Sequence, residues 1–250
     1  MSGRGPLRSG EPVMLIDRKR RRYLIDLADG GEFHSHSGVL PHDDMIGAPE
    51  GTTFRSTRGM VFTALRPTIT DFVLKMPRGA QVIYPKDIGP ILVLADLFPG
   101  ARVLESGLGS GALSTGMLRA GAEILGYELR EDFEATARSN VARFLGPEAL
   151  ERYDTQVRDD YEGIDATDLD RIVLDLPEPW RVVPHAEKAL RSGGILVAYT
   201  PSIMQVSQLH EALDESPFGF AETVEVLHLS LIHISEPTRP PLLSRMPSSA

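Results

Sequence analysis

The sequence predicts an α/β protein in which a mostly parallel, doubly wound sheet follows a small β-rich N-terminal domain. From residue 79 onward, apolar strand-like runs alternate with segments of helical periodicity, which is typical of parallel strands joined by crossover helices. Before residue 67, short β-like runs are separated by glycine and proline turns, which is typical of a small open sheet or barrel.

The β-rich N-terminal domain is placed at residues 1–66. Its expected strands are Val13–Ile16, Tyr23–Leu27, Gly51–Ser56 and Met60–Leu65. A helical bridge is expected at residues 67–78, because PTITDFVLKM has helical spacing and Thr70 could cap the helix.

The α/β domain is placed at residues 79–228. Its expected strands are Arg102–Glu105, Glu123–Glu128, Asp154–Arg158, Arg171–Asp175, Ile195–Tyr199 and Ala221–Leu229. Its expected helices are Asp87–Leu97, Gly111–Ala120, Arg130–Leu145, Val182–Arg191 and Ile203–Leu213. Ligands of such sheets bind at the carboxyl ends of the strands, so the residues that follow each strand are the candidate site residues.

The composition excludes several classes of protein. The 250 residues are 42% hydrophobic and 24% charged, which excludes intrinsic disorder, and the absence of cysteine excludes disulfides, cysteine nucleophiles and thiolate metal sites. No stretch approaches the roughly 18 apolar residues of a membrane span, and Met1–Gly10 lacks the apolar core of a signal peptide. We expect a soluble, cytoplasmic protein. His34, His36 and His42 have no carboxylate at a convincing ligand spacing, so no metal is expected.

The net charge of −9 conceals an uneven distribution. Up to Arg78 there are 12 Lys and Arg against 9 Asp and Glu, whereas the rest of the chain has 14 against 26. The local excess is Arg18–Arg22, five consecutive cations that could contact phosphates. A solvated hairpin turn explains the run equally well, since it lies between two expected strands.

A glycine-rich turn follows the strand Arg102–Glu105 and opens a helix. Gly107, Gly109 and Gly111 would let the backbone turn tightly and approach a ligand at the helix start. The spacing is G-x-G-x-G, whereas a dinucleotide site favours G-x-G-x-x-G, and the leading Glu105 would repel a pyrophosphate but could hold a cationic amino group. The combination favours S-adenosylmethionine over NAD, with a purely structural turn as the alternative.

Carboxylates follow the next strands. Glu128 ends the second strand, 21 residues after Gly107, where an acidic side chain can accept hydrogen bonds from both ribose hydroxyls of a nucleoside. Asp159 and Asp160 follow the third strand and could meet the adenine amino group. An exposed strand-end glutamate and a polar turn are the respective alternatives.

The segment VLDLPEPW, residues 173–180, places Asp175 at the end of a buried strand, before two prolines and the only tryptophan of the chain. A carboxylate there could accept a hydrogen bond from an exocyclic amine, orient the adjacent ring nitrogen and take up the amine proton. A helix-capping aspartate is the alternative. Tyr84 and Tyr199 lie at the same expected edge and could stack on a base.

Five segments together resemble a known family: PRGAQVIYPKD, VLESGLGSGAL, GYELREDF, DRIVLDLPEPW and VAYTPSIMQV. They are similar to tRNA (adenine-N1)-methyltransferases of the bacterial and archaeal TrmI type, most closely the actinobacterial branch, over about residues 3 to 228. The resemblance implies a Rossmann-like class I domain that transfers a methyl group from S-adenosylmethionine to N1 of adenosine 58 in the tRNA T-loop. It also implies a homotetramer and makes the basic N-terminal domain a candidate tRNA contact.

The resemblance assigns roles to individual residues. Asp175 would be the catalytic aspartate, also next to the cofactor, and Gln81, Tyr84 and Tyr199 would line the substrate pocket. The cofactor would be held by Glu105, Gly107, Leu108, Gly109, Ser110, Gly111, Glu128 and Asp159. The alternatives are a non-catalytic tRNA-binding subunit of the same fold and a methyltransferase for a protein or small molecule; an NAD oxidoreductase fails on the glycine spacing.

Residues 229–250 are expected to be a non-native tail. The segment from Leu229 to Arg239, LSLIHISEPTR, resembles the translation of a common sequencing-library adapter, whereas the family continues with further strands. We therefore leave this tail out of the fold prediction and expect the sheet to lack its last strands.

Overall fold

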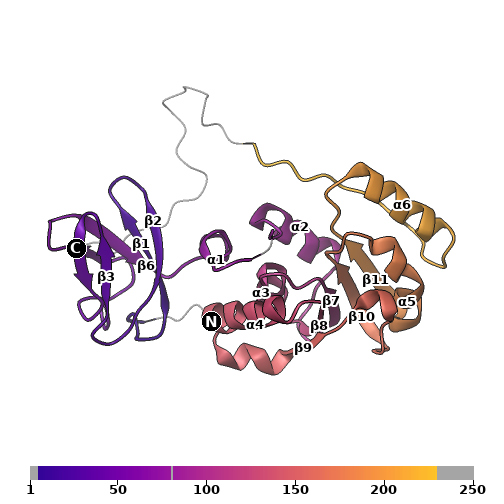
Figure 1. Ribbon diagram of the computed structural model, residues 1–250, viewed down its shortest axis with the longest axis horizontal. Helices are drawn as coiled ribbons and strands as arrows, with labels where there is room; N and C mark the ends of the chain where they lie inside the picture. Colours follow the sequence, from indigo (N-terminus) through magenta and orange to yellow (C-terminus); the bar gives the residue numbers. More distant parts are fainter. Residues whose placement is uncertain (1–4, 80, 230–250) are drawn as a thin grey trace. The chain divides into compact units, whose positions relative to one another are not determined.

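The computed structural model describes residues 5–79 and 81–229 (Figure 1). The chain divides into two compact units: an N-terminal unit that includes the residues up to Met76, and an α/β unit that spans Pro77–Leu227. The expected tail lies outside the described residues, apart from its first residue, Leu229.

The N-terminal unit is built on an antiparallel sheet with the strand order β2-β1-β6-β5. Its strands are β1 (Pro12–Asp17), β2 (Arg22–Asp26), β5 (Thr53–Arg55) and β6 (Val61–Leu65). A separate hairpin, β3 (Glu32–Ser35) with β4 (Gly38–Pro41), was not predicted, because each strand has only four residues and a glycine or proline sits at the ends of β4.

The core of the N-terminal unit forms because the inward-facing positions of its strands are apolar. Val13, Leu15 and Phe62 are fully buried, and the Phe33 and Phe62 rings pack edge to face with centroids 5.6 Å apart. Strand β6 alternates between buried and half-buried positions, whereas β1 also buries Met14 between Val13 and Leu15, so β1 is covered on both of its faces.

Helix α1 (Ile69–Lys75) begins at Thr68, so the prediction that Thr70 caps it was wrong. The Thr68 hydroxyl accepts a hydrogen bond from the Asp71 amide at 3.1 Å, and the Asp71 carboxylate accepts one from the Thr68 amide at 3.1 Å. This reciprocal pair satisfies two amide groups that a helix start otherwise leaves without partners. Thr70 lies two residues too late to make it.

The α/β unit contains a five-stranded parallel sheet with the order β11-β10-β7-β8-β9, which confirms the predicted fold class. The strands are β7 (Arg102–Ser106), β8 (Glu123–Glu128), β9 (Tyr153–Val157), β10 (Leu169–Leu174) and β11 (Leu190–Ala198). Val103, Leu104, Ile172, Val173 and Leu174 are fully buried at its centre, as a sheet covered on both faces requires.

Helices alternate with these strands, as predicted. They are α2 (Pro85–Leu94), α3 (Ala112–Ala120), α4 (Glu131–Leu145), α5 (Val183–Ala189) and α6 (Ile203–Asp214), with 3-10 turns at Pro147–Arg152, Asp160–Glu162 and Pro179–Val182. Within this unit α3 and α4 pack side by side, and α5 packs near β11 (Figure 1). Helix α5 is shorter than predicted, because Leu190 already pairs with Leu169 as part of β11.

The strand predicted at Ala221–Leu229 does not form. Val224 is 55% exposed and Leu227 is 73% exposed, so these apolar side chains gain no packing from the sheet. The run pairs with no described strand, so neither backbone hydrogen bonds nor the burial of one face fixes its register, and no strand forms. Among the described residues β11 is therefore an edge strand of the sheet. No described helix is both long and apolar enough to cross a membrane.

Candidate active site

Backbone hydrogen bonds join the segments that follow neighbouring strands at the carboxyl edge of the parallel sheet. The bonds run from Gly107 N to Tyr127 O at 3.0 Å, Arg158 N to Glu128 O at 2.9 Å, Asp175 N to Ser106 O at 2.9 Å and Tyr199 N to Leu174 O at 2.8 Å. Four predicted site regions, although far apart in sequence, therefore meet at one edge. This is where ligands of such sheets bind.

The glycine turn requires glycine for reasons visible in the structure. Gly107 has a φ of +84°, and a Cβ added there would overlap the carbonyl oxygen of Asp175. Gly111, with a φ of +76°, caps α3, and a Cβ there would lie 2.9 Å from the Ala137 carbonyl oxygen. The turn thus packs directly against the backbone of the Asp175 segment.

Glu128 lies at the end of β8 with only 7% of its surface exposed. Its Oε2 accepts a hydrogen bond from the Gly109 amide at 3.0 Å, and its Oε1 accepts one from the Arg130 amide at 3.1 Å. The predicted ribose-binding carboxylate and the predicted cofactor turn are therefore in direct contact. Each carboxylate oxygen keeps a second lone pair for a ligand hydroxyl.

Glu105 is buried at the end of β7, with 1% exposure, and its Oε2 has no hydrogen-bond partner among the described residues. The pKa of its carboxyl group is raised to about 8, mainly by burial and in part by the nearby carboxylates of Asp175 and Glu128, while hydrogen bonds from Ser114 act in the opposite direction. A buried carboxyl group with an unpartnered oxygen suits a cationic ligand group, because a cation would stabilise the charged form.

Asp159 and Asp160 have different surroundings. The Asp159 carboxylate accepts a hydrogen bond from the Tyr161 amide at 2.9 Å and so caps the turn Asp160–Glu162. Asp160 is buried, its Oδ1 has no partner among the described side chains, and burial raises its pKa to about 6. The Asp159 carboxylate is therefore used to cap the turn, whereas Asp160 has a carboxylate oxygen that is available to accept a hydrogen bond from a ligand. The two residues are adjacent in the sequence, so the sequence alone could not distinguish them.

Asp175 follows β10 directly, and it is half-buried. Burial raises the pKa of its carboxyl group to about 6, and the Glu128 carboxylate adds to the effect. Two residues after it, the Pro177 carbonyl oxygen accepts a hydrogen bond from the Gln205 side-chain amide at 2.8 Å. Gln205, at the start of α6, is thus a positioning residue for this segment.

Tyr84 and Tyr199 belong to the same edge of the unit. The Tyr199 amide donates a hydrogen bond to the carbonyl oxygen of Leu174, the residue before Asp175, at 2.8 Å. Burial raises the pKa of Tyr199, and the charges of Asp87 and Asp175 add to this. Tyr84 caps α2 and is 43% exposed, and Gln81 is exposed in the loop before α2. The structure therefore groups Tyr199 with Asp175 but leaves Gln81 outside the buried part of the site.

The pair Lys86 and Asp87 was not predicted as part of the site. Lys86 Nζ donates to Asp87 Oδ1 at 2.7 Å, and the other carboxylate oxygen of Asp87 is buried without a partner among the described residues. The only feature of the sequence that marks the Lys86–Asp87 pair is the segment YPKD.

The donor set fits S-adenosylmethionine. Glu105 and Asp160 each offer a buried, unpartnered oxygen, and Glu128 lies against the glycine turn, so the edge offers acceptors for an ammonium group, an amino group and hydroxyl groups. Within residues 5–79 and 81–229, no group of three or more His, Asp or Glu side chains is arranged to hold a metal ion.

Two sequence families match the chain. A family described as "tRNA methyltransferase complex GCD14 subunit" matches residues 59–233, and one described as "TrmI-like N-terminal" matches residues 5–54. Two solved structures of methyltransferases are also similar. TrmI, the tRNA (m1A58) methyltransferase of Aquifex aeolicus, has a TM-score of 0.76 and 29% identity over 90% of this chain and 87% of that one. A SAM-dependent O-methyltransferase of Thermotoga maritima has a TM-score of 0.79 and 32% identity over 85% and 80%.

Curated relatives agree with these families. The tRNA (adenine(58)-N(1))-methyltransferase TrmI of a Thermus thermophilus strain is 39% identical over 86% of this chain and 85% of its own length. The tRNA (adenine(57)-N(1)/adenine(58)-N(1))-methyltransferase TrmI of Methanocaldococcus jannaschii is 33% identical over 89% and 86%. The family match and these relatives, which extend along most of both sequences, show that the chain belongs to the GCD14/TrmI family of S-adenosylmethionine-dependent tRNA methyltransferases.

Proposed function

We propose that this protein methylates N1 of adenosine 58 in the T-loop of tRNA, with S-adenosylmethionine as the methyl donor. The observation that carries the proposal is the position of Asp175, a half-buried acid whose backbone packs against the glycine turn at the carboxyl edge of the sheet. The names of the Thermus and Aquifex relatives support the choice of tRNA and of this adenosine.

The proposed cofactor site consists of the glycine turn and the carboxylates around it. The turn, from Gly107 through Leu108, Gly109 and Ser110 to Gly111, would lie along the ligand, with Glu128 accepting hydrogen bonds from the ribose hydroxyls. Glu105 would hold the ammonium group. We assign the adenine amino group to Asp160 and leave Asp159 its capping bond, because only Asp160 combines burial with an unpartnered oxygen.

The proposed chemistry depends mainly on positioning. When bound, S-adenosylmethionine supplies a methyl group on a sulfonium centre, which is already electrophilic. The Asp175 carboxylate would accept a hydrogen bond from the exocyclic amine of the target adenine and so orient N1. As the ring becomes cationic, the amine becomes more acidic, and the same carboxylate can take its proton.

Tyr84 and Tyr199 would hold the target base by stacking, since aromatic side chains bind unpaired bases through their faces. Gln81 would contact the substrate from the loop before α2. Because Gln81 is exposed, whereas the carboxylates of the site are buried or half-buried, we expect it to affect tRNA binding more than the chemical step.

We further propose a homotetramer that acts in the cytoplasm. The family resemblance supports the tetramer, and the tRNA substrate supports the compartment. Sedimentation equilibrium of the purified protein tests the assembly, because a tetramer and a monomer differ fourfold in mass.

The decisive experiment is incubation with labelled S-adenosylmethionine and either an unmodified tRNA transcript or the same transcript with adenosine 58 replaced by guanosine. We expect label in the first transcript and none in the second. Equal labelling of both transcripts contradicts the proposed target. Absence of label in both, with tRNA still bound, supports a non-catalytic tRNA-binding subunit instead.

A further inference from the structure

Three turns of the N-terminal unit meet at one end of its sheet. The β1–β2 turn and the β5–β6 turn are at the same end, because Asp17 pairs with Phe62 and Arg55 pairs with Val61. The strand order β2-β1-β6-β5 places the two hairpins next to each other, across about 14 Å of sheet at the usual strand spacing.

His36 ties the third turn to the other two. Arg21 Nη1 donates to His36 Nε2 at 3.0 Å, and Arg58 Nη1 donates to the His36 carbonyl oxygen at 3.0 Å. Because a guanidinium can only donate, the His36 ring nitrogen accepts here. One histidine at the β3–β4 turn therefore fixes an arginine from each neighbouring turn.

Asp17 holds the β1–β2 turn in shape. Its buried carboxylate accepts hydrogen bonds from the Lys19 amide at 2.8 Å, the Arg21 amide at 2.9 Å and the Arg21 side chain at 2.6 Å. Asp17 thus neutralises Arg21 and leaves Arg18, Lys19 and Arg20 exposed. The run therefore lies in an exposed hairpin turn, as one of the two alternatives expected, and a buried acid shapes this turn so that it presents three cations.

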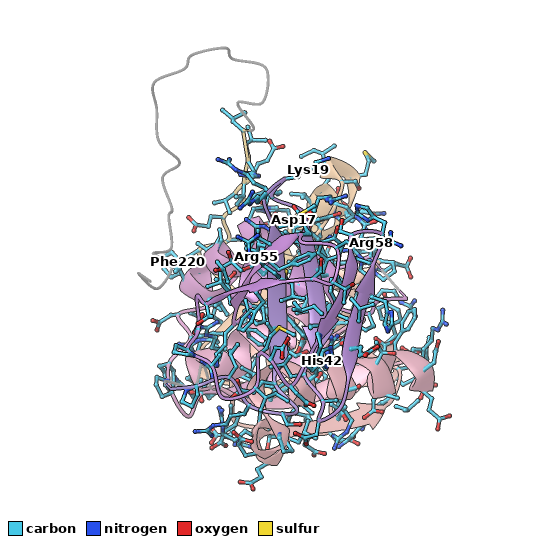
Figure 2. The ribbon with its side chains drawn as sticks, turned by 90° about the vertical axis from the view of Figure 1, so that its left-hand side faces the viewer. Asp17, Lys19, His42, Arg55, Arg58 and Phe220 are labelled. Atoms are coloured by element: carbon cyan, nitrogen blue, oxygen red, sulfur yellow. The ribbon has the colours of Figure 1, made fainter. Side chains whose placement is uncertain are left out.

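We define the cationic end as Arg18, Lys19, Arg20, Arg55 and Arg58, all of which are exposed. Figure 2 shows Lys19, Arg55 and Arg58 around Asp17 at one end of the sheet, with His42 toward the other. Among the described residues of this unit, the exposed carboxylates belong to the opposite end. Asp26 pairs with Pro12, Glu32 pairs with Pro41, Asp29 and Asp43 bond to Ser9 and Gly30, and Asp44 follows Asp43.

We propose that the cationic end binds the phosphate backbone of the tRNA substrate. This inference rests on the proposed function, which supplies an RNA partner, and adds where on the N-terminal unit that partner is held. Among the described residues, the acid beside these cations is Asp17, which is buried and bonded to Arg21, so the five exposed cations are left to bind a polyphosphate. A surface for anionic lipid would pair its cations with exposed apolar side chains. Among the described residues, none of the three turns carries an exposed large apolar side chain.

The test compares three variants of the full chain in binding to an unmodified tRNA transcript over a series of salt concentrations. The first variant is Arg18→Ser, Lys19→Ser and Arg20→Ser together, which leaves Asp17 and its hydrogen bonds in place. The second is Arg55→Ser. The matched control is Arg8→Ser, an exposed arginine of the same unit whose backbone bonds to Glu11 at the opposite end of the sheet.

We expect the triple variant to bind tRNA about tenfold or more weakly near 0.1 M salt, with the slope of log K against log salt reduced by roughly 2. Arg55→Ser should weaken binding about threefold, and Arg8→Ser should not change it. The KM for tRNA should rise in the triple variant, while kcat and the Kd for S-adenosylmethionine stay within about twofold of the wild type. Circular dichroism verifies the fold, and Arg55→Ser keeps the test valid if the triple variant unfolds.

The proposal is overturned if the wild-type tRNA affinity and salt slope persist in both Arg55→Ser and the triple variant. It is also overturned if these variants lose binding to phosphatidylserine vesicles while tRNA binding is unchanged. Salt-dependent tRNA binding through these residues without methylation would support the surface and contradict the proposed function. Methylation with an unaltered KM for tRNA in the variants would support the proposed function and contradict the proposed surface.

Discussion

The Glu128 carboxylate accepts a hydrogen bond from the Gly109 amide at 3.0 Å, so the end of β8 holds the turn after β7. A carboxylate that already bonds the turn is fixed before any ligand arrives. Such preorganisation lowers the conformational entropy lost when a ligand binds. Glu128 therefore has two roles in the proposal: it shapes the turn and it accepts hydrogen bonds from a ribose.

Replacing Glu128 with Gln should raise the Kd for S-adenosylmethionine about tenfold or more, because a charge-assisted hydrogen bond contributes about 1.5–3 kcal/mol. Isothermal titration calorimetry measures this. The matched control is Glu123→Gln, at the exposed start of the same strand, which should bind like the wild type. Equal affinities for wild type and Glu128→Gln would contradict the ribose assignment.

Asp160→Asn and Asp159→Asn should have different effects. Asp160→Asn changes the unpartnered buried acceptor and should weaken S-adenosylmethionine binding by about tenfold. Asp159→Asn retains an acceptor for the Tyr161 amide, so affinity and stability should change little. Binding titrations of the two variants decide between these neighbours; weaker binding in Asp159→Asn alone would restore the assignment made from the sequence.

Asp175→Asn should reduce kcat by roughly 10² to 10⁴, the usual contribution of a positioned general base, and should change tRNA affinity much less. In the wild type the raised pKa of Asp175, about 6, predicts that the rate falls as pH drops through that value, because the carboxyl group becomes neutral. Single-turnover rates between about pH 5 and 8 measure this limb. The control Asp168→Asn changes an exposed acid before the same strand, and it should keep both rate and pH profile.

Glu105 should make the cofactor-free protein less stable as pH rises. Its pKa is about 8 in the folded protein against 4.5 as the ordinary value, so between these limits the folded state binds more protons than the unfolded state. The free energy of unfolding therefore decreases with rising pH, by at most about 1.4 kcal/mol per pH unit from one proton. Asp160 and Asp175 act in the same direction only up to about pH 6.

Urea unfolding of the wild type and of Glu105→Gln isolates this contribution above about pH 6. The variant should show a flatter dependence up to about pH 8, since its amide does not titrate. Saturating S-adenosylmethionine should also flatten the wild-type curve if its ammonium group ionises Glu105. If the free energy of unfolding depends on pH in the same way in both proteins, the raised pKa of Glu105 is not the cause of the pH dependence.

The sequence predicted the parallel sheet and its carboxyl-edge residues because apolar runs, glycines and strand-end acids are local signals. Gly107, Glu128 and Asp175 could each be placed by their position relative to a strand. The capping box at Thr68 was missed because Thr70 offered the same side chain two residues later. The unused oxygen of Asp160 and the bond from Gln205 to Pro177 depend on contacts between distant segments, which no local pattern encodes.

Asp17 has a consequence for how the N-terminal unit can change over evolution. The β1–β2 turn takes its shape from this buried acid, and the Lys19 contribution to it is a backbone amide. Any side chain at position 18, and any at position 19 other than proline, which lacks the amide hydrogen, can therefore be presented on the same loop without rebuilding it. We expect homologous proteins to vary these two positions freely in size while retaining Asp17, so that substrate affinity could be adjusted separately from stability.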